Sequence, residues 1–304
     1  MIFLYYVTGD IPARHLAVAA GVKKSKCRWI CIQMVEIIIE SGFLDEYFQL
    51  PTEEQGRYEA KLFTQRSGMP EIFTGAVDGT QIDVWVKRRQ QKLFFNRYKR
   101  KAINCMAYGG ITGLFYALEA SASGSRHDNA VFQGSKLYEQ LNNGNLPFEG
   151  AKIVGDAAYT SDLPFMAIPF PDHDVKHNPE REKFNKKFRR LRSTVENDFG
   201  MWKGRFPVLQ NGIKCKSVRK AGRLVMALGA LNNFIVLQTT EQEMANATQQ
   251  SNKERTGKRR KYRYRPHVDT SSSEEELDDQ GRPKRKKRYT KKVPTSEVIR
   301  KTYF

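Results

Sequence analysis

The chain has 304 residues and is strongly basic, with 52 lysines and arginines against 33 aspartates and glutamates and a formal net charge of +19. At about 100–200 residues per domain, this length suffices for one to three domains. The charge favours a polyanionic partner such as nucleic acid. No apolar run approaches the roughly 20 residues that a spanning helix needs, and the start lacks the basic segment of a secretory signal, so we expect no membrane association.

Residues 1–70 are predicted to form a small helical region. A short helix over 11–20 is followed by a turn at Gly21-Val22 and a longer helix from Lys24 to about Glu40. Basic residues open the second helix, and two helices joined through a glycine turn resemble part of a helix-turn-helix. An ordinary helical hairpin explains the same pattern equally well, so both interpretations stay open.

The four cysteines are few and scattered: Cys27, Cys31, Cys105 and Cys215. Cys27 and Cys31 share one face of the predicted second helix, which is poor geometry for a disulfide, and a zinc site would need two more ligands at short spacing. We therefore expect reduced, mostly buried cysteines in a cytosolic or nuclear protein.

Residues 71–240 change to a pattern typical of an α/β domain. Residues with high strand propensity predict strands over the following ranges: 73–86, 102–108, 113–120, 152–154 and 165–169. A helix is expected to begin after Asp128, acting as its N-cap, and to run to Leu141. Strands followed by alternating helices favour an α/β architecture.

The strongest periodicity comes late, where apolar residues recur at steps of three and four: Phe184, Phe188, Leu191, Val195, Phe199, Trp202 and Phe206. This pattern predicts one long helix, ended by Pro207, whose apolar stripe packs on the sheet. Glu196 lies one residue, or about 100°, from that stripe. Arg189, Arg192 and Lys203 share its side of the helix.

The domain is predicted to close with a helix from Val218 to Leu237, and the composition changes at residue 240. Residues 241–304 hold 18 basic and 10 acidic residues, with basic clusters at 258–261 and 282–288 around an acidic run at 271–279. Few apolar residues are available for burial, so a disordered tail is expected. The basic clusters favour a nuclear-import signal, which would place the protein in the nucleus alone or also in the cytoplasm. The alternative is a solvated tail that no partner recognises.

Acidic residues occur where they suit metal chemistry. Asp78 precedes Gly79, and Asp156 follows Gly155, each at or near the end of an apolar strand. The ends of neighbouring parallel strands are about 4.8 Å apart, and two carboxylates there, with a third from a packed helix, form an oxygen cage suited to Mg²⁺. Two such ions about 3.5–4 Å apart activate a water or hydroxyl against a phosphodiester. Taken singly, each acid is better explained as a turn, a strand end or a surface helix pair.

Four motifs follow in order: Ala76-Val-Asp-Gly-Thr-Gln-Ile82, Gly124-Ser-Arg-His-Asp128, Val154-Gly-Asp-Ala-Ala-Tyr159 and Val195-Glu-Asn-Asp-Phe-Gly200. With these motifs, residues 70–237 resemble the PIF/Harbinger transposases and their domesticated nuclease relatives, within the DDE superfamily. The resemblance implies an RNase H-like α/β fold, a mixed five-stranded sheet flanked by helices. The expected domains are a helical region over 1–70, a nuclease domain over 71–240 and a tail over 241–304.

Position by position, the resemblance implies that Asp78, Asp156 and Glu196 are the catalytic acids and the ligands of Mg²⁺ or Mn²⁺. His127 and Asp128 are expected to support them as hydrogen-bond partners. The implied activity is DNA endonuclease, with strand transfer left open. A Myb-like DNA-binding partner is implied for end recognition and nuclear import, and the oligomeric state is not determined by the sequence.

Arg189, Arg192 and Lys203 are candidate contacts to DNA phosphates, although basic residues on a helix are by default solvated. Two alternative functions stay open. One is a domesticated DNA-binding or regulatory protein that has lost catalysis, and the other is an RNase H-type nuclease that cuts the RNA strand of a hybrid.

Overall fold

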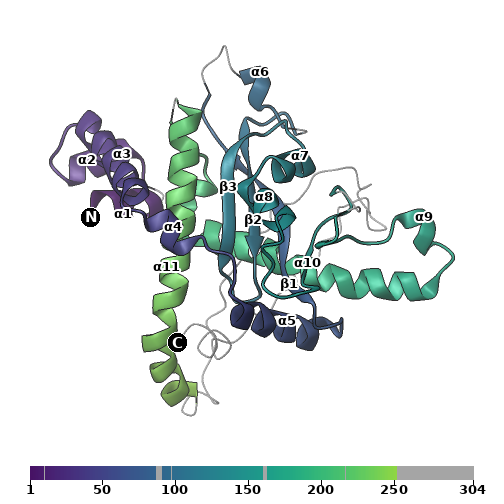
Figure 1. Cartoon of the computed structure of the whole chain (residues 1–304). Coiled ribbons are helices and arrows are strands. Elements are labelled where there is room, and N and C mark those ends of the chain that lie inside the picture. The colour runs from purple at the N-terminus through teal and green to yellow at the C-terminus, as the bar shows by residue number, and fades with distance from the viewer. Residues whose placement is uncertain (10, 87–90, 97, 160–162, 216, 252–304) are drawn as a thin grey trace, which may run out of the picture.

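The computed structural model describes residues 1–251 except 10, 87–90, 97, 160–162 and 216. Its centre is a five-stranded sheet in the order β3-β2-β1-β4-β5 (Figure 1). The strands are β1 (Phe73–Asp83), β2 (Ala102–Gly109), β3 (Phe115–Ser123), β4 (Lys152–Val154) and β5 (Met166–Ala167). β1, β2 and β3 pair antiparallel, whereas β4 pairs parallel to both β1 and β5. The expected mixed, RNase H-like sheet is confirmed.

Helices cover both faces of this sheet (Figure 1). One face carries α5 (Glu53–Ser67), α10 (Pro179–Arg205) and α11 (Val218–Ser251), and the other carries α7 (Asp128–Gln133) and α8 (Lys136–Asn142). Outside the N-terminal region, the short elements are α4 (Phe43–Tyr47), α6 (Gln91–Phe94), α9 (Asp172–Val175) and the 3-10 turn η2 (Pro207–Leu209). Each face has its own buried cluster, so the sheet is enclosed as in other three-layer α/β folds.

The N-terminal helical region is formed by α1 (Ile2–Thr8), α2 (Ala13–Ala19) and α3 (Lys24–Glu40). Figure 1 shows these helices together beside α11. Gly21, between α2 and α3, has a φ of 62°, a left-handed conformation that glycine adopts without steric cost. The turn therefore lies where the sequence predicts it. All four cysteines are free, as expected.

α10 is the long helix predicted from the apolar periodicity. Asn178 caps it, because the Asn178 side chain accepts hydrogen bonds from the backbone N–H groups of Glu180 and Arg181, and Pro179 follows at the first helical position. The predicted stripe is buried except for the partly buried Phe184: Phe188, Leu191, Val195, Phe199, Trp202 and Phe206. At about 1.5–3 kcal/mol for each buried side chain, this stripe fixes the helix firmly on the sheet.

The helix predicted from Asp128 to Leu141 is two short helices, α7 and α8. The break falls at Gly134-Ser135, because the Ser135 hydroxyl accepts a hydrogen bond from the Tyr138 N–H and begins a second helix. Asp128 is the first residue of α7 and not its N-cap, a position held by His127. The sequence therefore predicted the helical segment correctly but missed its division.

α11 begins at Val218 as predicted but continues beyond Leu237 and beyond the domain boundary expected at residue 240. Within the described part of the chain, its segment Val218–Thr239 is long and apolar enough to cross a membrane by length and composition, although the sequence analysis found no apolar run of that length. A mostly buried core helix passes the same test. Of that apolar window, 56% is buried, with Val225 and Leu228 in the core against the sheet. The charged clusters of the predicted tail lie outside the described residues.

Candidate active site

Two aspartates meet where the parallel pairing of β1 with β4 ends: Asp78 lies within β1 and not at its end as expected, and Asp156 lies just beyond β4. Ala76 of β1 pairs with Val154 of the parallel strand β4, and Asp78 and Asp156 each lie two residues further along. Because the strands run in the same direction, both carboxylates leave the sheet at equivalent positions. This register explains why two residues far apart in the sequence come together.

The two aspartates are held in the same way. The Oδ1 atom of Asp78 accepts a hydrogen bond from the Gly79 N–H at 2.8 Å, and the Oδ1 atom of Asp156 accepts one from the Ala158 N–H at 2.7 Å. The second oxygen of each, Oδ2, faces the guanidinium of Arg192. One oxygen thus fixes each side chain, and the other is presented to the site.

α10 brings the third acid to the same point. The Arg192 Nη2 atom lies 3.9 Å from Asp78 Oδ2, 3.6 Å from Asp156 Oδ2 and 3.5 Å from Glu196 Oε1. Glu196 is one helical turn after Arg192, so both side chains project from the same side of α10. The structure therefore gathers all three predicted acids around a single nitrogen atom.

The acid on the central strand is more buried than the acid on the helix. Asp78 exposes 15% of its side chain, whereas Glu196 exposes 52%. Burial raises the pKa of Asp78 to about 6; the Arg192 charge and the Gly79 N–H oppose this rise, and the Glu196 and Asp128 carboxylates add to it. A hydrated cation would therefore reach Asp78 from the more exposed side, at Glu196.

A fourth carboxylate lies close to Asp78 on the other face of β1. The buried Asn104 side chain of β2 donates from Nδ2 to Asp128 Oδ1 at 2.6 Å and to the Arg126 carbonyl at 3.0 Å. A Cβ atom on Gly79 would lie 2.3 Å from Asp128 Oδ1, so only glycine allows this approach. His127 is exposed, and its side chain makes no capping hydrogen bond.

Gly79→Ala is expected to lower the free energy of unfolding by about 1–3 kcal/mol, the usual cost of overpacking. The new methyl group would displace the Asp128 carboxylate from the hydrogen bond with Asn104. Urea unfolding followed by circular dichroism measures the change.

Gly204→Ala is the matched control, since a Cβ atom at this position of α10 would meet no atom of the other described residues within 4 Å, apart from its neighbours in the helix. Replacing glycine inside a helix should raise the stability by about 0.5–1 kcal/mol. The two substitutions are thus expected to act in opposite directions, and equal effects would contradict the close approach of Asp128 to Gly79.

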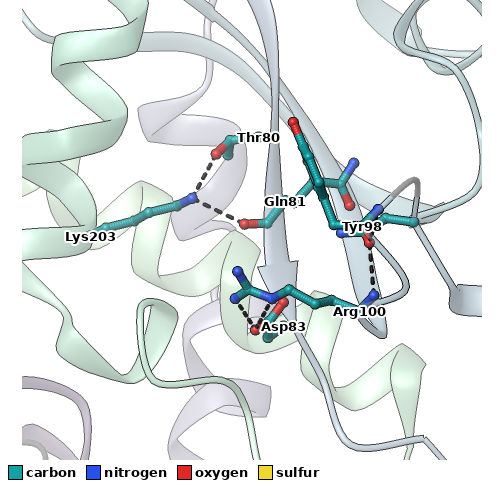
Figure 2. Close-up of polar contacts among 7 residues, drawn as sticks. Thr80, Gln81, Asp83, Tyr98, Arg100 and Lys203 are labelled. Carbon is teal, nitrogen blue, oxygen red and sulfur yellow. Dashed lines mark hydrogen bonds and ion pairs between the residues drawn. The ribbon is translucent and has the colours of Figure 1, made fainter. Parts of the chain in front are cut away.

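Lys203, a predicted phosphate contact, is bound to β1 (Figure 2). Its Nζ atom donates to Thr80 Oγ1 at 2.6 Å and to the Gln81 carbonyl at 3.1 Å. Burial lowers the pKa of Lys203. Of the three predicted basic contacts, Arg189 is exposed on α10, Arg192 lies among the acids and Lys203 ties α10 to the central strand.

Buried polar atoms without a hydrogen-bond partner among the described residues occur around the acids. They include Tyr159 Oη, Arg192 Nε and Asn104 Oδ1. The Tyr159 side chain is 3% exposed, and burial raises its pKa, with smaller contributions from the negative charges of Asp78, Asp128 and Asp156. Such atoms are rare in folded proteins and point to water or ligand at the site.

Sequence reasoning did not assign a role to Asn104 or Tyr159, and it did not foresee the central place of Arg192. An amide inside the otherwise apolar strand β2 was a usable signal for Asn104, because a buried amide needs partners. Tyr159 stood inside a quoted motif. No local pattern indicates that Arg192 contacts Asp78 and Asp156, since that contact depends on how α10 crosses the sheet.

The fold and the site define an RNase H-like domain with an acidic centre at the β1–β4 edge. Residues 77–233 match the family model described as DDE superfamily endonuclease. The chain belongs to this family. The match spans β1 to α11 and includes all three acids that meet at Arg192.

Among curated proteins, the chain is similar to "Putative nuclease HARBI1" of Rattus norvegicus, with 23% identity over 233 residues. The protein of the same name from Mus musculus is 22% identical over 233 residues. Each alignment covers 76% of this chain and 64% of the relative. The chain therefore spans less than two thirds of the length of these curated relatives. No solved structure matches.

Proposed function

We propose that the protein is a Mg²⁺- or Mn²⁺-dependent DNA endonuclease that hydrolyses phosphodiester bonds at the acidic site. The observation that carries the proposal is the convergence of three acids on one point: Asp78 from strand β1, Asp156 from the segment after β4, and Glu196 from helix α10. Membership of the endonuclease family and the similarity to proteins named "Putative nuclease" support the same chemistry. The net charge of +19 suits a nucleic-acid substrate.

The side-chain types at the site suit a hard divalent cation, although their present spacing does not form its ligand set. Carboxylate oxygens are the ligands that Mg²⁺ and Mn²⁺ prefer, and Mg²⁺ keeps several waters, for which the unpartnered Tyr159 hydroxyl offers a hydrogen-bonding group. Among the described residues no three His, Cys, Asp or Glu side chains lie close enough to hold an ion together. Arg192 lies between the acids instead. Bound metal would supply an activated water and charge stabilisation for the leaving oxygen.

The chain's own groups have separate tasks in this proposal. Asp78, Asp156 and Glu196 bind the cation, and the backbone N–H groups at Gly79 and Ala158 orient the two aspartates. Arg189, exposed on the same helix, is available to a DNA phosphate. Lys203 acts as a positioning residue, because it fixes α10 to β1 beside Asp78.

Strand transfer after cleavage, a nuclear location and a separate Myb-like DNA-binding partner belong to the proposal as extensions. They rest on the resemblance to PIF/Harbinger proteins and on the basic clusters of residues 241–304. The helix-turn-helix interpretation of α2 and α3 is a further extension, and it would add DNA contacts outside the acidic site.

Glu196→Gln is expected to lower the rate of Mn²⁺-dependent nicking of supercoiled plasmid by more than about a hundredfold. Loss of a group behind a metal ligand costs about 10–100-fold, so loss of the ligand itself should exceed that range. The assay compares nicked and supercoiled DNA on agarose gels with Mn²⁺, with Mg²⁺ and with EDTA.

Glu182→Gln is the matched control, since Glu182 is an exposed glutamate in the first turn of the same helix. It should nick plasmid at the wild-type rate. Equal background cleavage by wild type and Glu196→Gln would remove the nuclease proposal and favour the rival function, a DNA-binding protein without turnover. Cleavage confined to RNA–DNA hybrids would favour the RNase H-type alternative.

A further inference from the structure

Arg192 takes the position of a cation at the centre of the acidic site. Its Nη2 atom lies 3.5–3.9 Å from one oxygen of each acid. A guanidinium paired to a single carboxylate normally approaches to about 2.7–2.9 Å. Nη2 donates one long hydrogen bond, to Glu196 Oε1 at 3.5 Å, and its positive charge is shared with Asp78 and Asp156.

Arg192 is also poorly held by other groups. Its Nε atom is buried without a hydrogen-bond partner among the described residues. The side chain is 23% exposed and extends from α10, which packs against β1. The carboxylates are thus the principal partners of this guanidinium.

The balance of charge explains why an internal cation is needed. Three carboxylates lie around Arg192, and Asp128 adds a fourth negative charge that also acts on Asp78. Like charges this close in a partly buried site repel one another strongly. A single guanidinium offsets part of that repulsion, and a divalent cation would offset more.

We propose that Arg192 is the internal counter-ion of the acidic site and that divalent cations and its guanidinium compete for the same three carboxylates. The inference rests on the proposed function, because it assigns the cation site to these acids. With a cation at the acids, the guanidinium would move away from Asp78 and Asp156, toward the exposed side of the site at Glu196. There its planar donors suit a phosphate of the DNA, so metal loading and readiness for substrate are coupled.

Mn²⁺ titration of the full chain tests this competition without an activity assay. Free Mn²⁺ is measured by its electron paramagnetic resonance signal for wild type and Arg192→Gln. Removal of the competing charge is expected to tighten Mn²⁺ binding by at least about tenfold. Arg192→Lys, which keeps the charge as a compact ammonium, should stay close to wild type.

Arg190→Gln is the charge-matched control. Arg190 is exposed on α10, two residues or about 200° from Arg192, and so lies on another side of the helix. Its substitution removes the same charge from the protein and should leave the Mn²⁺ affinity unchanged. Tightening of the same size in Arg190→Gln would overturn the proposal by showing that net charge alone sets the affinity.

Arg192→Gln leaves the acids without their internal cation and is expected to melt at a lower temperature without metal. Mn²⁺ should then raise the melting temperature more for this variant than for wild type, a comparison that holds even for a destabilised protein. If Arg192→Gln binds Mn²⁺ no more tightly than wild type while Asp78→Asn abolishes binding, the proposed competition is overturned and the proposed metal site is not. Mn²⁺ binding that does not depend on Asp78 in any variant would overturn the proposed function as well.

Discussion

Asp78→Asn is expected to reduce metal-dependent plasmid nicking by at least about a thousandfold, the upper range for removal of one group that stabilises charge in a transition state. Asp78 is the most buried of the three acids, and it stands on the central strand β1, which contacts both β4 and α10. An amide at this position keeps the shape of the side chain but presents no negative charge to a cation. Nicking rates with Mn²⁺, at protein concentrations well above the DNA, measure the effect.

Asp83→Asn provides the control on the same strand. Asp83 is five residues after Asp78, on the opposite face of β1, where it forms an ion pair with Arg100 (Figure 2). This substitution removes the same charge and should leave the nicking rate within about threefold of wild type, because surface ion pairs contribute about 0–1 kcal/mol. A nuclease activity that survives Asp78→Asn, or falls equally in Asp83→Asn, would contradict the assignment of Asp78.

Trp202→Ala is expected to cost about 3–5 kcal/mol of unfolding free energy, as for other fully buried tryptophans. The Trp202 ring has no exposed surface, and its ring centroid lies 5.4 Å from that of Phe115 in an edge-to-face arrangement. Its indole N–H donates to the Leu228 carbonyl at 3.1 Å. One side chain therefore joins α10, β3 and α11, and its loss loosens the helix that carries Glu196 and Arg192.

Chemical denaturation followed by far-ultraviolet circular dichroism measures this loss without relying on tryptophan fluorescence. Trp85→Ala is the matched control, because 63% of the Trp85 residue is exposed. Its substitution should change the stability by about 0.5 kcal/mol or less. A similar loss in both variants would mean that Trp202 does not have the packing role described here.

The long helix and the strands show how much local pattern can predict. A stripe with a period of three and four residues specifies α10 whatever it packs against, because its apolar side chains have to be removed from water together. The same holds for β1 and β2, which contain β-branched and aromatic residues typical of strands, although β1 ends at Asp83 and not at residue 86 as predicted. The division between α7 and α8 was missed because a single serine cap, Ser135, outweighed a continuous helical pattern.

Glu59 illustrates a feature that sequence reasoning could not reach. This glutamate on α5 is fully buried and accepts hydrogen bonds from the Ile111 N–H, the Thr112 hydroxyl and the Tyr116 hydroxyl. In the sequence it resembles any charged residue on a helix surface. Only the packing of α5 against the turn between β2 and β3 makes it an internal hydrogen-bond acceptor.

The amino-acid sequence by itself determined the positive charge and the α/β elements, which follow from residue type and periodicity acting locally along the chain. The three acids were identified through the ordered motifs and their resemblance to the PIF/Harbinger proteins. The tertiary structure decided which groups meet, through the parallel register of β1 with β4 and the crossing of α10 over the sheet. For this reason Arg192, a surface arginine by its spacing, lies instead among Asp78, Asp156 and Glu196, where long-range packing and charge balance hold it.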